Sequence, residues 1–202
     1  MIAIINYGVG NLFSLNSSLA YLGLDAQITA DPKVIEAADR IILPGVGAFA
    51  DARAKLDATG LVPLLKSEAE SGKPLLGICL GMQMLFDTSL EYGTHEGLGL
   101  IHGTVAPIAD DLQNPLKVPH MGWNALHFTR PDPLFRYIKE GDHVYYVHSY
   151  YAKNCEADTI AVSEYGIQVT GAVGKGKIYG TQFHPEKSGK VGLAILSAFS
   201  EL

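Results

Sequence analysis

Cysteine, long apolar segments and positive charge are all scarce in this sequence of 202 residues. The two cysteines, Cys79 and Cys155, form no C-x-x-C pair, which predicts free thiols and a cytoplasmic protein. No run approaches the roughly 18 apolar residues of a membrane span, and the short apolar segment after Met1 indicates a first strand rather than a signal peptide. The net charge of −6, without any basic stripe, argues against a nucleic-acid-binding protein.

Apolar residues make up 48% of the chain, which is enough for a substantial core, and their spacing predicts the fold class. In the first half, short apolar runs alternate with helical patterns, which favours an α/β fold with a mostly parallel sheet flanked by helices. The expected strands are 2–8, 25–29, 40–45 and 74–79, and the expected helices are 11–23 and a region around 56–65.

The second half of the chain has a different pattern. Strand-like segments separated by turn residues indicate additional antiparallel or mixed strands, and a helix at 189–202 closes the chain. The expected strand segments are 98–108, 124–128, 143–151, 159–165, 167–173 and 177–183. Since no repeat or linker interrupts the sequence, we predict a single domain over residues 1–202.

The segment GICLGMQ, residues 77–83, places Cys79 between Gly77 and Gly81 at the end of an apolar run. Small residues on both sides of a nucleophile permit a nucleophile elbow, because side chains there would block the close approach of the backbone. A helix starting at this point directs free N–H groups at the sulfur, which favours the thiolate, and the Leu80 amide would face an oxyanion. A small, buried and inert cysteine is the alternative interpretation.

The segment QFHPEKS, residues 182–188, offers a base for such a nucleophile. In an extended segment, residues two apart point the same way, so His184 and Glu186 can share one face, while Pro185 restricts the backbone between them. Glu186 would hold one ring nitrogen of His184 while the other faces Cys79. A single histidine is more often structural than catalytic, but this spacing beside a glycine-flanked cysteine favours the catalytic interpretation.

A third segment, LPGVGAF at residues 43–49, also lies at a strand end. Gly45 and Gly47 permit unusual backbone angles, so the amides between them can turn toward a ligand. An ordinary strand-to-helix turn is the alternative. A phosphate-binding P-loop is disfavoured, because the lysine and the serine or threonine of that motif are missing.

Together and in this order, PGVGAF, GICLGMQ and QFHPEKS resemble the class I, or triad, glutamine amidotransferases over essentially the whole chain. The resemblance implies a glutaminase in which Cys79 attacks the side-chain amide of glutamine, His184 protonates the leaving ammonia and Glu186 orients His184. Water then releases glutamate from the thioester. The backbone N–H groups of Leu80 and Val46 would form the oxyanion hole, and neither a cofactor nor a metal is expected.

The same resemblance implies a set of glutamine-binding residues. Gln83 and Glu91 match binding side chains, with Glu91 pairing with the α-ammonium group of the substrate. Ser149 and Tyr150 would complete the pocket largely through backbone groups, and Gly47 would lie beside the substrate. Without the resemblance, Gln83 is interpreted as an exposed helix residue and Glu91 as a solvated loop charge.

Within this family, GNLFSL, PGVGAF and above all VPHMGWN at residues 118–124 resemble the glutaminase subunits of imidazole glycerol phosphate synthase, an enzyme of histidine biosynthesis. The implied partner is a (β/α)₈-barrel cyclase subunit, which receives ammonia before it becomes ammonium in water. Six residues match partner-facing positions: Asn11, Pro119, Met121, Trp123, Tyr145 and Lys187. Trp123, the only tryptophan of the chain, has a core aromatic beneath a loop as its alternative interpretation.

Three other functions stay open from the sequence. The chain could be a glutaminase subunit of a different class I amidotransferase, or a thiol hydrolase of another amide or ester that needs no partner. It could also be a catalytically silent binding module, although the intact set of Cys79, His184 and Glu186 argues against that function. Steady hydrolysis of glutamine analogues without a partner would favour the thiol hydrolase.

Overall fold

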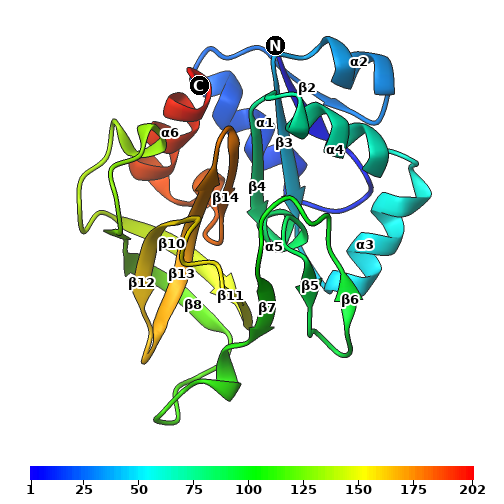
Figure 1. Cartoon of the computed structure of the whole chain (residues 1–202). Helices are drawn as coiled ribbons and strands as arrows, with labels where there is room; N and C mark the ends of the chain where they lie inside the picture. Colours follow the sequence, from blue (N-terminus) through cyan, green and yellow to red (C-terminus); the bar gives the residue numbers. More distant parts are fainter.

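The computed structural model describes all 202 residues and contains a main sheet of eight strands in the order β2-β1-β3-β4-β14-β13-β12-β9 (Figure 1). The strands from β2 to β14 in this order run parallel, and β13, β12 and β9 continue the sheet antiparallel. Their bounds are β1 Ile2–Ile5, β2 Ala26–Thr29, β3 Arg40–Gly45, β4 Leu75–Cys79, β9 His127–Phe128, β12 Thr159–Glu164, β13 Gln168–Lys175 and β14 Ile178–Thr181. The predicted α/β fold with additional mixed strands is confirmed.

Two smaller sheets lie at the end of the main sheet where β3 and β4 finish (Figure 1). One pairs β8 (His120–Ala125) with β10 (His143–His148) in antiparallel fashion. The other has the order β11-β7-β5-β6, formed by Tyr150–Lys153, Thr104–Pro107, Thr88–Ser89 and His95–Glu96. These strands build the walls around the carboxyl ends of the parallel strands.

Helices cover both faces of the main sheet, as expected for parallel strands that are buried on both sides. One core cluster of 27 buried residues joins the sheet to α2–α5, and a second of 21 joins it to α1 and α6, so the two faces are covered to a similar extent. The helices are α1 Leu12–Tyr21, α2 Pro32–Ala37, α3 Phe49–Ala58, α4 Val62–Glu70, α5 Leu80–Met84 and α6 Gly189–Phe199, with 3₁₀ turns η1 Ile108–Asp110, η2 Pro133–Phe135 and η3 Pro185–Lys187. No helix combines the length and the apolar content needed to cross a membrane.

The elements differ from the sequence predictions at several places; for example, only Thr104–Pro107 of the expected strand 98–108 forms a strand, β7. The helical region expected around 56–65 is two helices, α3 and α4, because Gly60 adopts φ +70° and ends the first. Helix α2 is absent from the sequence predictions, since six residues are too few for a clear period, although the Asp31 side chain caps it and Pro32 is its first residue. The expected strand 143–151 is divided into β10 and β11, which belong to different sheets.

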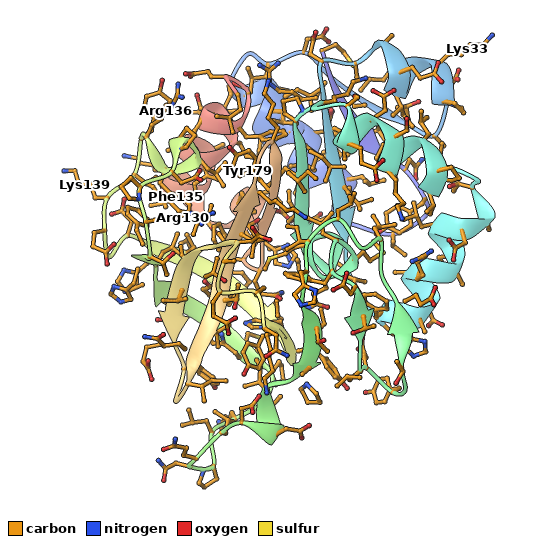
Figure 2. All side chains as sticks on the ribbon, viewed as in Figure 1. Lys33, Arg130, Phe135, Arg136, Lys139 and Tyr179 are labelled. Atoms are coloured by element: carbon orange, nitrogen blue, oxygen red, sulfur yellow. The ribbon has the colours of Figure 1, made fainter.

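The segment 129–142 covers the antiparallel half of the main sheet beside α6. Arg130 donates to the carbonyl oxygen of Gly174 on β13, and Arg136 forms an ion pair with Glu201 just beyond α6. Figure 2 shows Arg136 and Lys139 at the outer edge of this segment, on the side of the molecule where α6 lies. The segment therefore closes the side of the fold remote from α3 and α4 (Figure 1).

Candidate active site

The register of three adjacent parallel strands brings the three sequence motifs together. Gly45 at the end of β3 pairs with Cys79 at the end of β4. On the other side of β4, Thr181 of β14 pairs with Ile78, so Gln182 comes next to Cys79. Because the carboxyl ends of parallel strands meet at one edge of a sheet, residues 45, 79 and 182 form the floor of one site.

Cys79 sits on the sharp strand-to-helix turn that its flanking glycines predict. Its backbone has φ +54° and ψ −111°, an uncommon conformation for a residue with a side chain, and α5 begins at the next residue. A Cβ atom on Gly77 would lie 2.7 Å from the carbonyl oxygen of Gly81, and one on Gly81 would overlap the carbonyl oxygen of Leu43. Helix α5 has only five residues, and none of its backbone N–H groups bonds the Cys79 side chain, so the predicted contact between the helix start and the sulfur is not seen.

His184 and Glu186 form a buried pair beside Cys79. The His184 Nδ1 atom lies 2.8 Å from the Glu186 Oε1 atom, and the two side chains are 2% and 3% exposed. A carboxylate accepts, so Nδ1 carries a proton and Nε2 is left for Cys79. Burial alone would lower the pKa of His184, but hydrogen bonds to Cys79 and Glu186 outweigh it and raise that pKa to about 10. The charged imidazole is therefore favoured next to the sulfur.

A cavity of about 530 Å³ opens above this floor, a size suited to a small-molecule substrate. It collects most of the residues that the sequence resemblance indicates, whereas Glu186 lies behind His184, and Asn11, Met121, Trp123 and Tyr145 lie outside it. The predicted residues that line it are Val46, Gly47, Cys79, Leu80, Gln83, Glu91, Pro119, Ser149, Tyr150, His184 and Lys187. Their individual roles in binding and catalysis stay predictions.

Gln83 and Glu91 are buried in the cavity wall rather than exposed to solvent. The side-chain nitrogen of Gln83 donates to the carbonyl oxygen of Tyr150 at 3.1 Å and to the Gln182 side chain at 3.0 Å. The Oε2 atom of Glu91 accepts from the backbone N–H of Phe49 at 2.6 Å. The exposed alternatives for both residues are therefore wrong, and Glu91 is tied to the first residue of α3.

The loop that contains Val46 is fixed by contacts at Pro44 and Gly45, whereas Gly47 has open space around it. The Tyr7 hydroxyl donates to the carbonyl oxygen of Pro44 at 2.6 Å, and burial together with the nearby Cys79 charge raises the pKa of Tyr7. A Cβ atom on Gly45 would approach the backbone nitrogen of Gly81 to 2.7 Å. Gly47 has φ +91° with open space around it. The two glycines are thus needed for different reasons, one for close packing and the other for its conformation.

Two buried histidines that sequence reasoning did not single out extend the site away from Cys79. His148 lines the cavity and donates from Nδ1 to the carbonyl oxygen of Tyr150 at 2.8 Å. Its Nε2 atom must then accept from His120 Nδ1 at 2.9 Å, and His120 Nε2 accepts from Asn124 at 3.2 Å. Burial lowers the pKa of His148 to about 3 and that of His120 to about 4, so both are neutral near pH 7.

The only hint of this pair in the sequence is that the segments VPHMGWN and VHSY each contain a histidine. The antiparallel register of β8 and β10, which places His120 opposite His148, is what brings the two rings together.

The outward face of β8 and β10 presents apolar side chains to solvent next to the cavity. Met121 and Trp123 are 64% and 56% exposed, and the Trp123 ring meets the Tyr145 ring edge-on with centroids 6.1 Å apart. Trp123 is therefore not a core aromatic. Lys187 at the rim of the cavity forms no ion pair within the chain, and the Asn11 side chain does not cap α1. Exposed apolar residues that adjoin one another are common at interaction surfaces, and the partner interface stays a prediction.

The chain is similar to known proteins over almost its whole length. The glutamine amidotransferase class-I family model matches residues 3–200. The chain is 52% identical over 202 residues to the imidazole glycerol phosphate synthase subunit HisH of Geobacillus kaustophilus (strain HTA426), covering 98% of this chain and 95% of the relative. It is 49% identical to the subunit of the same name from Caldanaerobacter subterraneus subsp. tengcongensis, covering 100% of this chain and 98% of the relative.

Solved structures share the fold at much lower sequence identity. A glutamine amidotransferase crystal structure superposes with a TM-score of 0.76 at 18% identity, covering 99% of this chain and 100% of that one. PurLQS from Thermotoga maritima gives a TM-score of 0.76 at 17% identity, with 99% and 97% covered. These likenesses support the fold alone, whereas the family model and the relatives at about half identity confirm the resemblance found in the motifs. The chain belongs to the class-I glutamine amidotransferases, within the family of the imidazole glycerol phosphate synthase subunit HisH.

Proposed function

We infer that this chain is the glutaminase subunit of an imidazole glycerol phosphate synthase, which hydrolyses glutamine and passes the ammonia to a cyclase subunit in histidine biosynthesis. The main support for this function is that Cys79, His184, Gln83 and Glu91 line one cavity. The chain is also 52% identical to a HisH subunit. Residues 1–202 act as one glutamine amidotransferase domain, since the cavity draws on both halves of the chain.

The first half of the reaction forms a thioester. The Cys79 thiolate attacks the side-chain amide carbon of glutamine, and the carbonyl oxygen becomes an oxyanion that the N–H groups of Leu80 and Val46 receive. The protonated His184 gives its Nε2 proton to the leaving nitrogen as the carbon–nitrogen bond breaks. Ammonia leaves, and the γ-carbonyl of the substrate stays bonded to the sulfur.

The second half returns the enzyme to its starting state. His184, now neutral, takes a proton from water, and the resulting hydroxide attacks the thioester carbonyl. The carbon–sulfur bond breaks, releasing glutamate and the Cys79 thiolate, while His184 is charged again. Glu186 keeps Nδ1 protonated throughout, as the 2.8 Å contact supports. A neutral His148 nearby adds no second positive charge that would compete with the charged form of His184.

The substrate's two ends would be held by different parts of the cavity. The buried carboxylate of Glu91 uses one oxygen for Phe49, so its other oxygen can accept from the α-ammonium group of glutamine. Ser149 and Tyr150 at the junction of β10 and β11, and Gly47 on the loop after β3, also line the cavity and would complete the pocket for glutamine. This arrangement directs the side-chain amide toward Cys79.

The partner is a (β/α)₈-barrel cyclase that docks on the exposed patch formed by Met121, Trp123 and Tyr145. Pro119 and Lys187 connect this patch to the cavity, since both line its rim. Docking here would cover the opening of the cavity, so ammonia would reach the cyclase without crossing bulk water, where protonation would remove its nucleophilic lone pair.

Glutamate release should be measured for the chain alone, with the cyclase subunit, and with cyclase plus its ribonucleotide substrate. We expect little release by the chain alone, a large increase with the loaded cyclase, and no release by the Cys79→Ala variant, since loss of a triad member costs on the order of 10⁴-fold or more. The Cys155→Ala variant is the matched control and should stay active. Rapid release by the chain alone, unchanged by the cyclase, would instead identify a partner-independent thiol hydrolase.

A further inference from the structure

The side chain of Gln182 lies next to Cys79, the proposed nucleophile. It follows the last residue of β14, and the parallel register that pairs Thr181 with Ile78 carries the next residue to the level of Cys79. The side chain is fully buried, and its nitrogen lies 3.7 Å from the Cys79 Sγ atom, within hydrogen-bonding distance for sulfur. Apart from His184, Gln182 is the only residue whose side chain donates a hydrogen bond to the Cys79 sulfur.

The orientation of the Gln182 amide is determined by its neighbours. The carbonyl oxygen of Tyr150 can only accept, so the end of the Gln83 side chain that contacts it must be the NH₂ group. The same NH₂ group also donates to Gln182 at 3.0 Å, which must therefore present its oxygen. Hence the Gln182 nitrogen faces Cys79. His148 Nδ1 donates to the same Tyr150 oxygen and holds that acceptor in place.

We propose that Gln182 is a further catalytic residue, whose side-chain N–H group donates to the Cys79 sulfur and stabilises the thiolate. Hydrogen bonds to a charged acceptor are stronger than bonds to a neutral one, so this donor favours the thiolate over the thiol. Because the amide is neutral, it does so without adding a positive charge that would compete with the charged His184. This role of Gln182 rests on the proposed function, which identifies Cys79 as the nucleophile.

A packing role alone does not account for an amide at this position. Burying an amide is unfavourable unless its donor and acceptor are both bonded, and an apolar side chain of similar length would fill the space without that penalty. The neighbours of Gln182 on the chain, Thr181 and Phe183, are also fully buried, but neither contacts Cys79 through a hydrogen bond. The two partners of the Gln182 side chain are a residue of the substrate cavity and the nucleophile itself.

The test measures the rate at which iodoacetamide alkylates Cys79 between about pH 6 and pH 9, because alkylation requires the thiolate. Alkylation at Cys79 is distinguished from that at Cys155 by peptide mass, so the assay needs neither glutamine nor the cyclase. The variants are Gln182→Met, which keeps the length without the donor, and Gln182→Glu, which places a carboxylate at the sulfur. The control is Thr181→Val, which removes a buried hydroxyl that has no hydrogen-bond partner.

We expect Gln182→Met to slow Cys79 alkylation near neutral pH by about 10- to 100-fold, the range for losing a hydrogen bond to a charged group. The rate should recover at higher pH. Gln182→Glu should slow it further, since a carboxylate opposes the thiolate. In the complex with cyclase, kcat for glutamine should fall in parallel with less change in KM, and Thr181→Val should match the wild type in both assays.

A folded Gln182→Met chain that reacts at the wild-type rate across the pH range would overturn the proposal and leave Gln182 a structural residue. If that variant fails to fold, as judged by circular dichroism, wild-type reactivity of Gln182→Glu overturns it instead. Loss of alkylation in a chain whose wild type shows no glutaminase activity would support the role of Gln182 while rejecting the proposed function.

Discussion

At the scale of single residues, the candidate site depends on the two hydrogen bonds that join the His184 ring to Cys79 and to Glu186. The raised pKa of His184 results from hydrogen bonds on both sides of its ring, which together exceed the effect of burial. We expect its two neighbours to contribute unequally to catalysis, because Cys79 would react with the substrate and Glu186 would only orient the base.

The first prediction concerns this triad. His184→Ala should reduce kcat nearly as much as Cys79→Ala, because base and nucleophile act as a unit, on the order of 10⁴-fold or more. Glu186→Gln should be milder, since a base remains but its orientation is impaired. The His184→Ala and Glu186→Gln double variant should lose little more than His184→Ala alone. Multiplicative effects in steady-state kinetics would contradict the coupling.

The second prediction concerns pH and the buried pair His120 and His148. Folding lowers the pKa of each from 6.5, to about 4 and about 3, so the unfolded chain binds these protons first as the pH falls. Their contribution to stability is therefore complete above pH 6.5 and is lost progressively between 6.5 and about 3. His148→Gln retains a donor and an acceptor but cannot titrate, so its stability should fall less on acidification.

Urea unfolding at about pH 7.5 and about pH 5 measures this difference, with m-values checked for two-state behaviour. The amide introduced by His148→Gln should preserve the bond to Tyr150, so glutaminase activity of the variant in the cyclase complex reports whether the geometry survived. An identical loss of stability in wild type and variant between the two pH values would show that other groups dominate.

At the scale of elements, helix α6 packs against η3, the turn that directly follows His184 and carries Glu186. Gly192 packs against η3 so closely that a Cβ atom there would overlap the carbonyl oxygen of Pro185. Pro185 separates His184 from Glu186, so the first turn of α6 sets where both side chains lie. Backbone contact of this kind leaves no room for adjustment by rotamer changes.

The third prediction follows from this contact. Gly192→Ala should destabilise the fold by about 1–3 kcal/mol, the usual range for overpacking, even though alanine is intrinsically the better helix former. Any folded fraction should have a lower kcat, because Pro185 and its neighbours are displaced. Lys190→Ala, at an exposed position of the same helix, is the control. Thermal unfolding measures the stability of the variant, and steady-state kinetics measures its kcat. A stabilised, fully active Gly192→Ala would contradict the packing argument.

At the scale of the whole molecule, the exposed apolar patch of Met121, Trp123 and Tyr145 lies next to the cavity, so one docked protein can contact both. The fourth prediction is that Trp123→Ala weakens binding of the cyclase subunit by about 2 kcal/mol or more, as is common for a buried aromatic anchor at an interface. Tyr137→Ala, an exposed aromatic on the segment beside α6, is the control and should bind normally. Titration calorimetry showing equal affinity for both variants would remove Trp123 from the interface.

The fifth prediction concerns activation by the partner. Only the Leu80 amide of the two proposed oxyanion donors belongs to a helix, while Val46 lies on a loop whose tip at Gly47 has a positive φ and open surroundings. Gly47→Ala should change the ratio of cyclase-stimulated to basal kcat more than it changes stability, because losing one donor costs roughly 10²–10³-fold. Gly176→Ala, at another open glycine with positive φ, controls for backbone strain. An equal ratio of cyclase-stimulated to basal kcat in the wild type and Gly47→Ala would contradict a role of this loop in activation.

The sequence alone was sufficient for features that depend on neighbours in the chain. The glycines around Cys79, the spacing of His184 and Glu186, and the alternation of apolar runs with helical patterns each express a local requirement of backbone space or side-chain direction. These requirements are satisfied within a few residues, so a short stretch of sequence is enough to recognise each of them. They predicted the class of fold and the turn at Cys79, and the resemblance of the motifs to known amidotransferases indicated the family.

Only the tertiary structure decided which distant residues complete the site. Gln182 reaches Cys79 because β14 pairs with β4 across more than half the chain, and His120 meets His148 because β8 and β10 pair in one particular register. Gln83 is buried because Tyr150 and Gln182, which are remote in the chain, contact it, and Glu91 is buried where it meets Phe49 at the start of α3. Strand pairing between remote segments is determined by the packing of the whole core, and a shift of one residue in the pairing of β8 with β10 would place His120 and His148 on opposite faces of their sheet.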